Sequence, residues 1–557
     1  MSVGSPLFFI ASLIAFAICV RRDSPFGKGA LLIFNLIFVA LFFNSIATIA
    51  PLAVFCLAGY CAVQIASRQR GLVVFWALLT ALLLLFIVIK KYAIFEQYTP
   101  LGLDYPAIGL SYILFRVLHL IVDCREGTIE KPPTIREYLT YILFFLTFVS
   151  GPINRFDSFR EDLEAKPPSL EKAEIAEALQ RIVIGVLKVF VVSVCAFQIS
   201  LNLPLTIGAD PAGLSAHTLA PAAILDWYST QAGEPVLRFS ARYLLRCFAF
   251  LAYMYFNFSG YMDIVIGIGR LLGFRIPENF NHPFGAGNFL EFWSRWHITL
   301  SDWFRTYLFN PLLKTLASAT PSRSAAPYLA VPAFFITFFV MGVWHGTTPA
   351  FVIYGLMLAS GVSANMFFQI LAQRGLGRKK YRKLCGNFIY RNLCRSTMIA
   401  FFALSLTCLW LDTGELAQMA KIFGALGLLK LWVSASIAVF FAVLIWDLTE
   451  SVLMDRHVVL TEIVFSAGMI YLIAAWGDVG GFRSLLTQAI GLALPGAFIA
   501  ILGAAVIVLS GRLRATKNIS PKNLNANLCR LSCHVFLFFV AMLMQTGSVP
   551  EFVYEGF

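Results

Sequence analysis

Long apolar runs recur along the chain, and short segments rich in polar and charged residues separate them. Runs of this length match the thickness of a bilayer core. Lipid offers the backbone no hydrogen-bond partners, so such runs are expected to be helices. The pattern predicts spans near residues 6–20, 30–66 (two short helices), 72–90, 106–123, 139–153, 182–202, 243–274, 327–346, 350–372, 395–411, 424–449, 460–476, 486–510 and 530–546. We therefore predict an all-α polytopic membrane protein with roughly 12–15 transmembrane helices plus re-entrant or interfacial helices.

Composition supports the same class. The chain has 557 residues, of which 59% are hydrophobic and 13% charged, and a soluble globular domain could not bury that much apolar surface. The first apolar run is followed by Arg21 and Arg22, which favours a retained helix over a cleaved signal peptide. Eleven cysteines are scattered without metal or disulfide spacing. We expect one integral membrane domain over residues 1–557, with no metal site.

The net charge of +13 raises the question of nucleic-acid binding, but the basic residues lie in short loops between spans, where positive-inside bias explains them. The segment from Arg374 to Arg395 has eight basic residues and no acidic one, so we place it in the cytoplasm. A second basic loop, at 512–522, falls on the same side after an even number of spans. His345 then lies toward the outer side. The eight basic residues also suit an acidic carrier protein or anionic lipid.

Residues 278–314 interrupt the membrane pattern with a segment dense in tryptophan, arginine and acidic residues. On one helix, Trp293, His297 and Ser301 would share a face, because they are spaced four residues apart. Two interpretations stay open here. One is an interfacial helix with an aromatic belt and a satisfied polar histidine. The other is a histidine placed for proton transfer near neutral pH.

His345 ends the apolar stretch FFITFFVMGVWHG at 334–346. An imidazole in such surroundings needs a hydrogen-bond partner or a water-filled cavity. Gly346 lets the backbone turn sharply after it. A histidine bonded to a carbonyl for structural reasons stays an alternative to a functional one.

Two motifs together, FWSRWHITLS at 292–301 and MGVWHG at 341–346, resemble the paired signatures of the membrane-bound O-acyltransferase family. The segments FNFSGYMD at 256–263, GFRIPENFNHPF at 273–284 and FVSGPINRF at 148–156 strengthen the resemblance. It covers a core of about residues 80–375, and the C-terminal helices at about 395–557 are compatible with it. The resemblance implies helices arranged around a central tunnel.

Two bacterial branches of the family compete. SGPINRF at 150–156 is similar to the proteins that transfer D-alanine to teichoic acids, whereas RLLGFRIPENF at 270–280 is similar to the proteins that O-acetylate alginate and other exopolysaccharides. D-alanyl transfer is slightly favoured, because PLLK at 311–314 departs from the Pro-Leu-Gly-Gly turn of the acetylating branch. FRTY at 304–307 also lacks the acid that many members have there, so any role of that acid is absent or falls to Asp302.

The resemblance implies acyl transfer from a cytoplasmic thioester, on a phosphopantetheinyl carrier protein or coenzyme A, to a hydroxyl of a cell-envelope polysaccharide or teichoic-acid-like acceptor. No cofactor is expected to stay bound. The implied partners are an accessory envelope transferase and the lipid bilayer, and the implied location is the bacterial inner membrane. Nucleic acid is not an expected partner. His345 would be the general base, and His297 would position the acceptor or polarise the thioester carbonyl. The implied substrate-binding residues are Trp293, Trp296, Ser301, Trp344 and Asp263.

Several alternatives remain. Ser301 as an acyl-enzyme nucleophile is disfavoured, because the family resembles a direct-transfer system. Asp263 is equally compatible with an ion pair to Arg270 or Arg275. Arg116, His119 and Asp123 share a helical face and suit a structural network. A transporter or flippase without chemistry is the alternative from another class, but the inverted repeats typical of transporters are not visible in the sequence.

Overall fold

The computed structural model describes residues 14–15, 25–90, 107–166, 172–202 and 236–453, except positions 321 and 323. Within them the chain forms helices and no strand, and one isolated bridge pairs Phe280 with Trp296. The α-helices are α2 (Pro25–Ala40), α3 (Ile46–Arg68), α4 (Leu72–Lys90), α5 (Leu110–Glu126), α6 (Ile135–Ile142), α7 (Phe156–Glu164), α8 (Lys172–Leu187), α9 (Ser193–Asn202), α11 (Val236–Leu272), α12 (Phe289–Trp293), α13 (Ile298–Phe304), α14 (Asn310–Ala319), α15 (Ala330–Trp344), α16 (Pro349–Leu376), α17 (Arg378–Cys385), α18 (Phe388–Ser405) and α19 (Thr413–Leu453).

Seven helical segments in this part of the chain are long and apolar enough to cross a membrane. They are Ala47–Arg68, Leu72–Lys90, Glu177–Ser200, Ala326–Trp344, Pro349–Leu376, Phe388–Leu409 and Phe423–Leu444. The predicted all-α polytopic class is therefore confirmed. The spans predicted at 460–476, 486–510 and 530–546, and most of 6–20, lie outside the described residues.

The span predicted at 139–153 is wrong. Helix α6 ends at Ile142, and the chain then runs without regular helix to Arg155. Phe144 and Phe148 are fully buried, so this apolar run packs inside the protein. Irregular backbone is tolerated there because polar side chains bond to it: Arg116 donates to the carbonyls of Ile142 and Thr147. The run predicted at 106–123 does form helix α5, which is buried on nearly every face.

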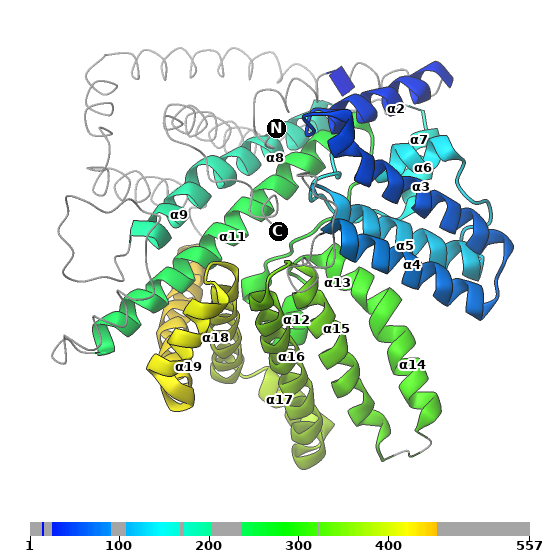
Figure 1. Ribbon diagram of the computed structural model, residues 1–557. Coiled ribbons are helices and arrows are strands. Elements are labelled where there is room, and N and C mark those ends of the chain that lie inside the picture. The colour runs from blue at the N-terminus through cyan, green and yellow to red at the C-terminus, as the bar shows by residue number, and fades with distance from the viewer. Residues whose placement is uncertain are drawn as a thin grey trace, which may run out of the picture.

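Helices α15 and α16 form an antiparallel hairpin, and α8 runs beside α11 (Figure 1). The hairpin packs closely because glycines face each other across it: a Cβ on Gly342 would lie 2.3 Å from the Cα of Gly355. Its connecting turn carries His345. The turn meets α5, where the Trp344 ring packs on Phe115 with centroids 4.8 Å apart.

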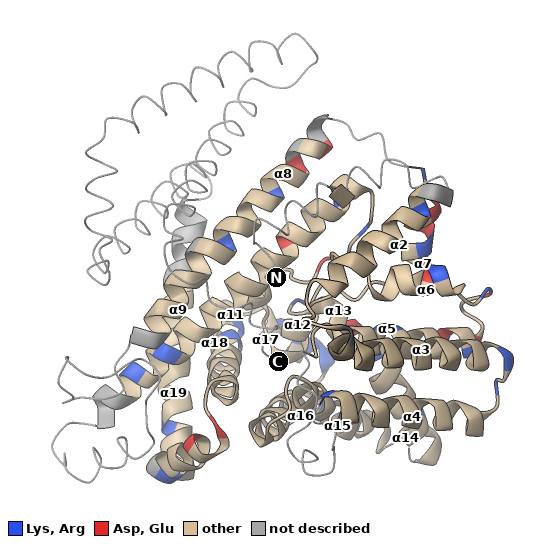
Figure 2. Cartoon of the chain, turned by 45° about the horizontal axis from the view of Figure 1, so that its top comes forward, with Lys and Arg blue, Asp and Glu red and all other residues tan. Residues whose placement is uncertain are grey.

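Charged residues lie mainly near helix ends and in connections, whereas long stretches of the helices are uncharged (Figure 2). The basic segment after Arg374 begins at the end of α16 that is remote from the His345 turn. Three of its eight basic side chains bind within the chain: Arg374 bonds to Tyr328, and Arg391 and Arg395 pair with Asp447. The other five are exposed and all lie on helix α17: Arg378, Lys379, Lys380, Arg382 and Lys383.

Candidate active site

His297 lies in a tight turn and not on a continuous helix. Helix α12 ends at Trp293 and α13 begins at Ile298. His297 caps α13 with left-handed backbone angles, φ 46° and ψ 53°, a conformation that few non-glycine residues adopt. The expectation that Trp293, His297 and Ser301 share one helical face is therefore wrong. The reason is long-range: the bridge between Phe280 and Trp296 pulls the chain out of the helix.

The side chain of His297 is 1% exposed and is held from two sides. Its Nδ1 lies 3.2 Å from Oδ1 of Asn279, and its ring packs edge-on against Phe258, with centroids 4.9 Å apart. Asn279 also accepts hydrogen bonds from the backbone and hydroxyl of Thr299. Asn279 and Thr299 were not singled out as site residues from the sequence, although the motif at 273–284 contains Asn279.

His345 follows the last residue of α15 and is 7% exposed. Its Nδ1 lies 2.6 Å from the carbonyl oxygen of Met341, one turn earlier in the helix. The rings of Trp344 and Tyr354 contact the imidazole, with centroids at 4.9 Å and 5.7 Å. The turn requires Gly346 for a steric reason, not for a left-handed backbone: an added Cβ would lie 2.0 Å from a ring carbon of Phe351.

Burial holds the pKa of His297 well below its usual value, and His345 lies near enough to lower that pKa further. The His297 imidazole is therefore neutral at physiological pH. Burial also lowers the pKa of His345, to about 4, so both rings are neutral and each has one ring nitrogen that can accept a proton.

The predicted tryptophans differ in their contacts, and Trp344 packs against His345. Trp296 is stacked on Phe292 and enclosed by aromatic rings, so it forms a packed wall. Trp293 packs against Phe338 of α15. The indole nitrogens of Trp293 and Trp344 are buried and have no hydrogen-bond partner among the described residues. These two N–H groups are therefore donors that a bound substrate could use.

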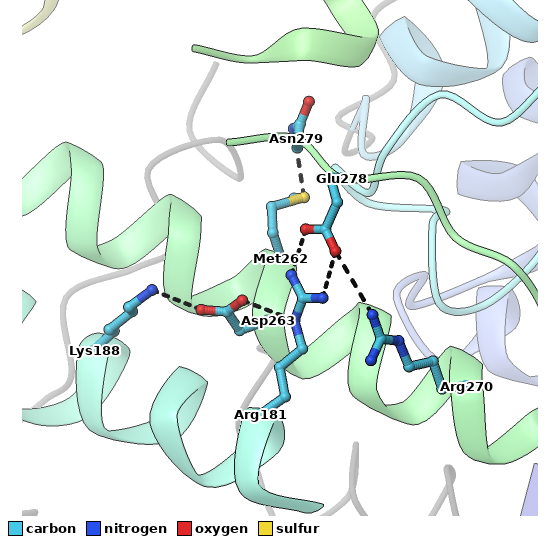
Figure 3. Close-up of polar contacts among 7 residues, drawn as sticks. All are labelled: Arg181, Lys188, Met262, Asp263, Arg270, Glu278 and Asn279. Carbon is cyan, nitrogen blue, oxygen red and sulfur yellow. Dashed lines mark hydrogen bonds and ion pairs between the residues drawn. The ribbon is translucent and has the colours of Figure 1, made fainter. Parts of the chain in front are cut away.

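The side chains of Ser301 and Asp263 bond to groups other than the histidine rings, although the Ser301 backbone N–H donates to the His297 carbonyl at 3.0 Å. The Ser301 hydroxyl donates to the carbonyl of Trp296 at 3.4 Å. Asp263 forms ion pairs with Arg181 at 3.0 Å and Lys188 at 2.7 Å, which join α11 to α8 and the following π-helical turn (Figure 3). The pairing considered with Arg270 or Arg275 is wrong, because Arg275 binds Asp162 instead and Arg270 faces Glu278.

The three residues of α5 that were expected to share a face have different partners. Arg116 is fully buried against backbone carbonyls. Asp123 accepts hydrogen bonds from the Tyr307 hydroxyl at 3.0 and 2.9 Å. His119 packs edge-on against Tyr141, with centroids 5.8 Å apart. The shared face therefore ties α5 to three other parts of the core.

A cavity of about 290 Å³ opens beside these residues. It is lined by His119, Ile153, Asn154, Arg155, Ser158, Arg275, Pro277, Thr299, Asp302, Trp303 and Tyr307. His119 Nε2 and Asn154 Oδ1 are buried and have no hydrogen-bond partner among the described residues. Thr299 connects the cavity to His297 through Asn279. The cavity thus offers buried hydrogen-bonding groups, and only Asn279 lies between its Thr299 wall and His297.

The fold and this site define a polytopic membrane protein with two buried histidines. One lies in the connection between α12 and α13, and the other in the connection between α15 and α16. Residues 222–409 match the model of the MBOAT, membrane-bound O-acyltransferase family. The resemblance found in the sequence is therefore confirmed over this range. The matched range contains both histidines.

Similar proteins come from both branches. The chain is 30% identical over 284 residues to the teichoic acid D-alanyltransferase of Bacillus subtilis, covering 50% of this chain and 62% of that protein. It is 32% identical over 261 residues to the enzyme of the same name from Streptococcus thermophilus, covering 46% and 56%. It is 28% identical over 249 residues to the probable alginate O-acetylase AlgI of Pseudomonas aeruginosa, covering 44% and 40%. The chain thus spans about half the length of these relatives.

Proposed function

We propose that this chain is an O-acyltransferase of the bacterial inner membrane that moves a small acyl group from a cytoplasmic thioester to a hydroxyl of a cell-envelope glycopolymer. The observation that carries the proposal is the pair of buried histidines, His297 and His345, each of which has Nδ1 beside an oxygen acceptor. Acyl transfer to an alcohol needs a positioned base in a site that excludes water, because water would hydrolyse the thioester.

The proposed step begins at His345. Its Nδ1–H donates to the Met341 carbonyl, so in the neutral ring Nε2 is the nitrogen that takes up a proton. His345 Nε2 removes the hydroxyl proton of the acceptor, and the oxygen attacks the thioester carbonyl carbon. The resulting oxyanion collapses, the carbon–sulfur bond breaks, and the proton passes from His345 to the leaving thiolate. His297 positions the acceptor or polarises the carbonyl.

The acyl group is D-alanyl or acetyl, and we favour D-alanyl. The two D-alanyltransferases above match over 284 and 261 residues at 30% and 32% identity, against 249 residues at 28% for the O-acetylase. O-acetylation of an exopolysaccharide is the second candidate, because that relative is still 28% identical.

Purified protein in proteoliposomes tests the function directly. D-alanyl and acetyl thioesters are supplied on a carrier protein or on coenzyme A, and ester formation on a polymer acceptor is followed by mass spectrometry. His345→Ala should lower the rate about a hundredfold to ten-thousandfold, and His297→Ala should also lose transfer. His282→Asn is the matched control, since His282 is exposed and also has a left-handed backbone. Substrate movement without ester formation would instead support a transporter.

The cavity beside His119 is the proposed place of the donor's polar arm. Arg155 lines it, and although its charge acts on Asp123 and Asp157, the guanidinium forms no direct ion pair among the described residues, so it suits a phosphate. Arg155→Gln should raise the KM for the thioester about tenfold, the equivalent of one charge-assisted hydrogen bond. Arg160→Gln is the control, because Arg160 pairs with Glu137 and does not line the cavity. An unchanged donor KM in Arg155→Gln would refute this placement.

A further inference from the structure

Asn279 is held by several independent contacts and is fully buried. Its segment runs antiparallel to the turn that carries His297: Ile298 N–H donates to the Asn279 carbonyl at 3.0 Å, and Asn281 N–H donates to the Arg295 carbonyl at 2.9 Å. These two backbone hydrogen bonds fix the position of Asn279 relative to His297.

The orientation of the Asn279 amide follows from its neighbours. The backbone N–H of Thr299 lies 3.1 Å from Oδ1, and because a backbone N–H can only donate, the atom facing it must be the oxygen. The Thr299 hydroxyl accepts from Ile153 N–H at 3.2 Å and donates to the same oxygen at 3.0 Å. The amide nitrogen points the other way, to the sulfur of Met262 at 3.4 Å (Figure 3).

An oxygen 3.2 Å from His297 Nδ1 requires the hydrogen to be on that nitrogen. A neutral imidazole has only one such hydrogen, so Nε2 has the lone pair. We propose that Asn279 is a positioning residue that holds His297 in the Nδ1–H tautomer, so that His297 Nε2 accepts a hydrogen bond from a second hydroxyl of the acceptor, not the one that His345 deprotonates, and does not donate one to the thioester carbonyl. This assignment rests on the proposed function and chooses between the two roles of His297.

An amide suits this task better than a carboxylate. Asn279 cannot take the proton from His297, and a neutral pair avoids the cost of burying two charges. With His297 acting as an acceptor, the donors for the developing oxyanion must come from other groups. The buried indole N–H groups of Trp293 and Trp344 meet that requirement among the described residues.

The first experiment measures the tautomer without using activity. The full chain, labelled with ¹⁵N-histidine and reconstituted in lipid nanodiscs, is examined by NMR, and the His297 signals are assigned with His297→Gln. Protonated and unprotonated ring nitrogens have well separated shifts, so we expect a protonated Nδ1 and an unprotonated Nε2. Asn279→Leu should mix the tautomers, whereas Thr299→Val, which keeps the Asn279 contact, should not. A wild-type Nε2–H signal would overturn the assignment.

The second experiment uses kinetics. Asn279→Leu should lower kcat/KM about tenfold to a hundredfold, as loss of a ligand-orienting partner does elsewhere, with the KM of the acceptor rising. Asn279→Asp should restore the acceptor KM near neutral pH but add an activity loss at acidic pH, because a carboxylate beside Nδ1 favours protonated His297. Equal losses in both variants, matched by loss of folded protein, would mean a merely structural role. If wild-type protein transfers no acyl group, the proposed function fails, while the NMR result still decides the tautomer.

Discussion

Replacing Asp263 with Asn distinguishes substrate binding from structural support at this position. Asp263 bonds to Arg181 and Lys188, and the side chains are 15%, 20% and 27% exposed. These values lie between an exposed ion pair, which contributes about 0–1 kcal/mol, and a fully buried one, whose disruption costs about 3–5 kcal/mol. Asn keeps one acceptor oxygen but loses the charge that faces Lys188. We therefore expect Asp263→Asn to destabilise the protein by about 1–3 kcal/mol.

Thermal unfolding in detergent micelles measures the effect for Asp263→Asn, Lys188→Met and the double variant. Because the two residues share one interaction, the double variant should lose less stability than the sum of the single variants. Glu161→Gln is the control: its ion pair with Arg275 is 69% and 64% exposed, and we expect less than about 1 kcal/mol.

Activity per folded molecule should stay within about twofold of wild type in Asp263→Asn, because Asp263 reaches Asn279 only indirectly, through Arg181 and Glu278 and through the adjacent Met262, and the backbone hydrogen bonds that hold Asn279 beside His297 stay in place. The reasoning would be refuted by additive losses in the double variant. It would equally be refuted by an unchanged unfolding temperature together with a large rise in acceptor KM, since that combination would make Asp263 the substrate-binding residue predicted from the sequence.

Three further variants test other contacts. Gly346→Ala should cost about 1–3 kcal/mol and most of the activity, because its Cβ meets the Phe351 ring; adding Phe351→Leu should recover part of both, as measured by unfolding and transfer assays. Arg116→Leu should prevent stable folding, because it leaves two buried carbonyls without their donor; normal yield by size-exclusion chromatography would contradict this. Lys379→Glu with Lys380→Glu should abolish transfer from a carrier protein but not membrane insertion if α17 docks that carrier, whereas transfer at the wild-type rate would rule the docking out.

The apolar runs predicted most described spans correctly, because a lipid-facing helix needs continuous hydrophobicity and the sequence displays it directly. Reliance on the same signal explains why the span predicted at 139–153 is wrong. Hydrophobicity alone cannot tell lipid from protein interior, and the groups that stabilise this irregular segment, such as Arg116 and Asn35, lie far away in the sequence.

The motifs identified the two histidines as candidates, but they did not predict the local geometry. Spacing predicted one helix through His297, whereas pairing between Phe280 and Trp296 imposes a turn. Asn279 was visible only as one letter of a motif, because its importance comes from three donors that converge on its oxygen. Such convergence is a property of the folded chain and leaves no periodic signal in the sequence.

The two histidines differ in how their protons are fixed. His345 donates to a backbone carbonyl one helical turn away, and no single side-chain substitution removes that acceptor. His297 faces a side-chain oxygen, so substitution at Asn279 changes its tautomer while the backbone stays in place. The helix backbone therefore fixes the tautomer of His345, whereas a side-chain substitution can change the tautomer of His297. Changes that tune acceptor binding without abolishing chemistry should accordingly fall around His297, not around His345.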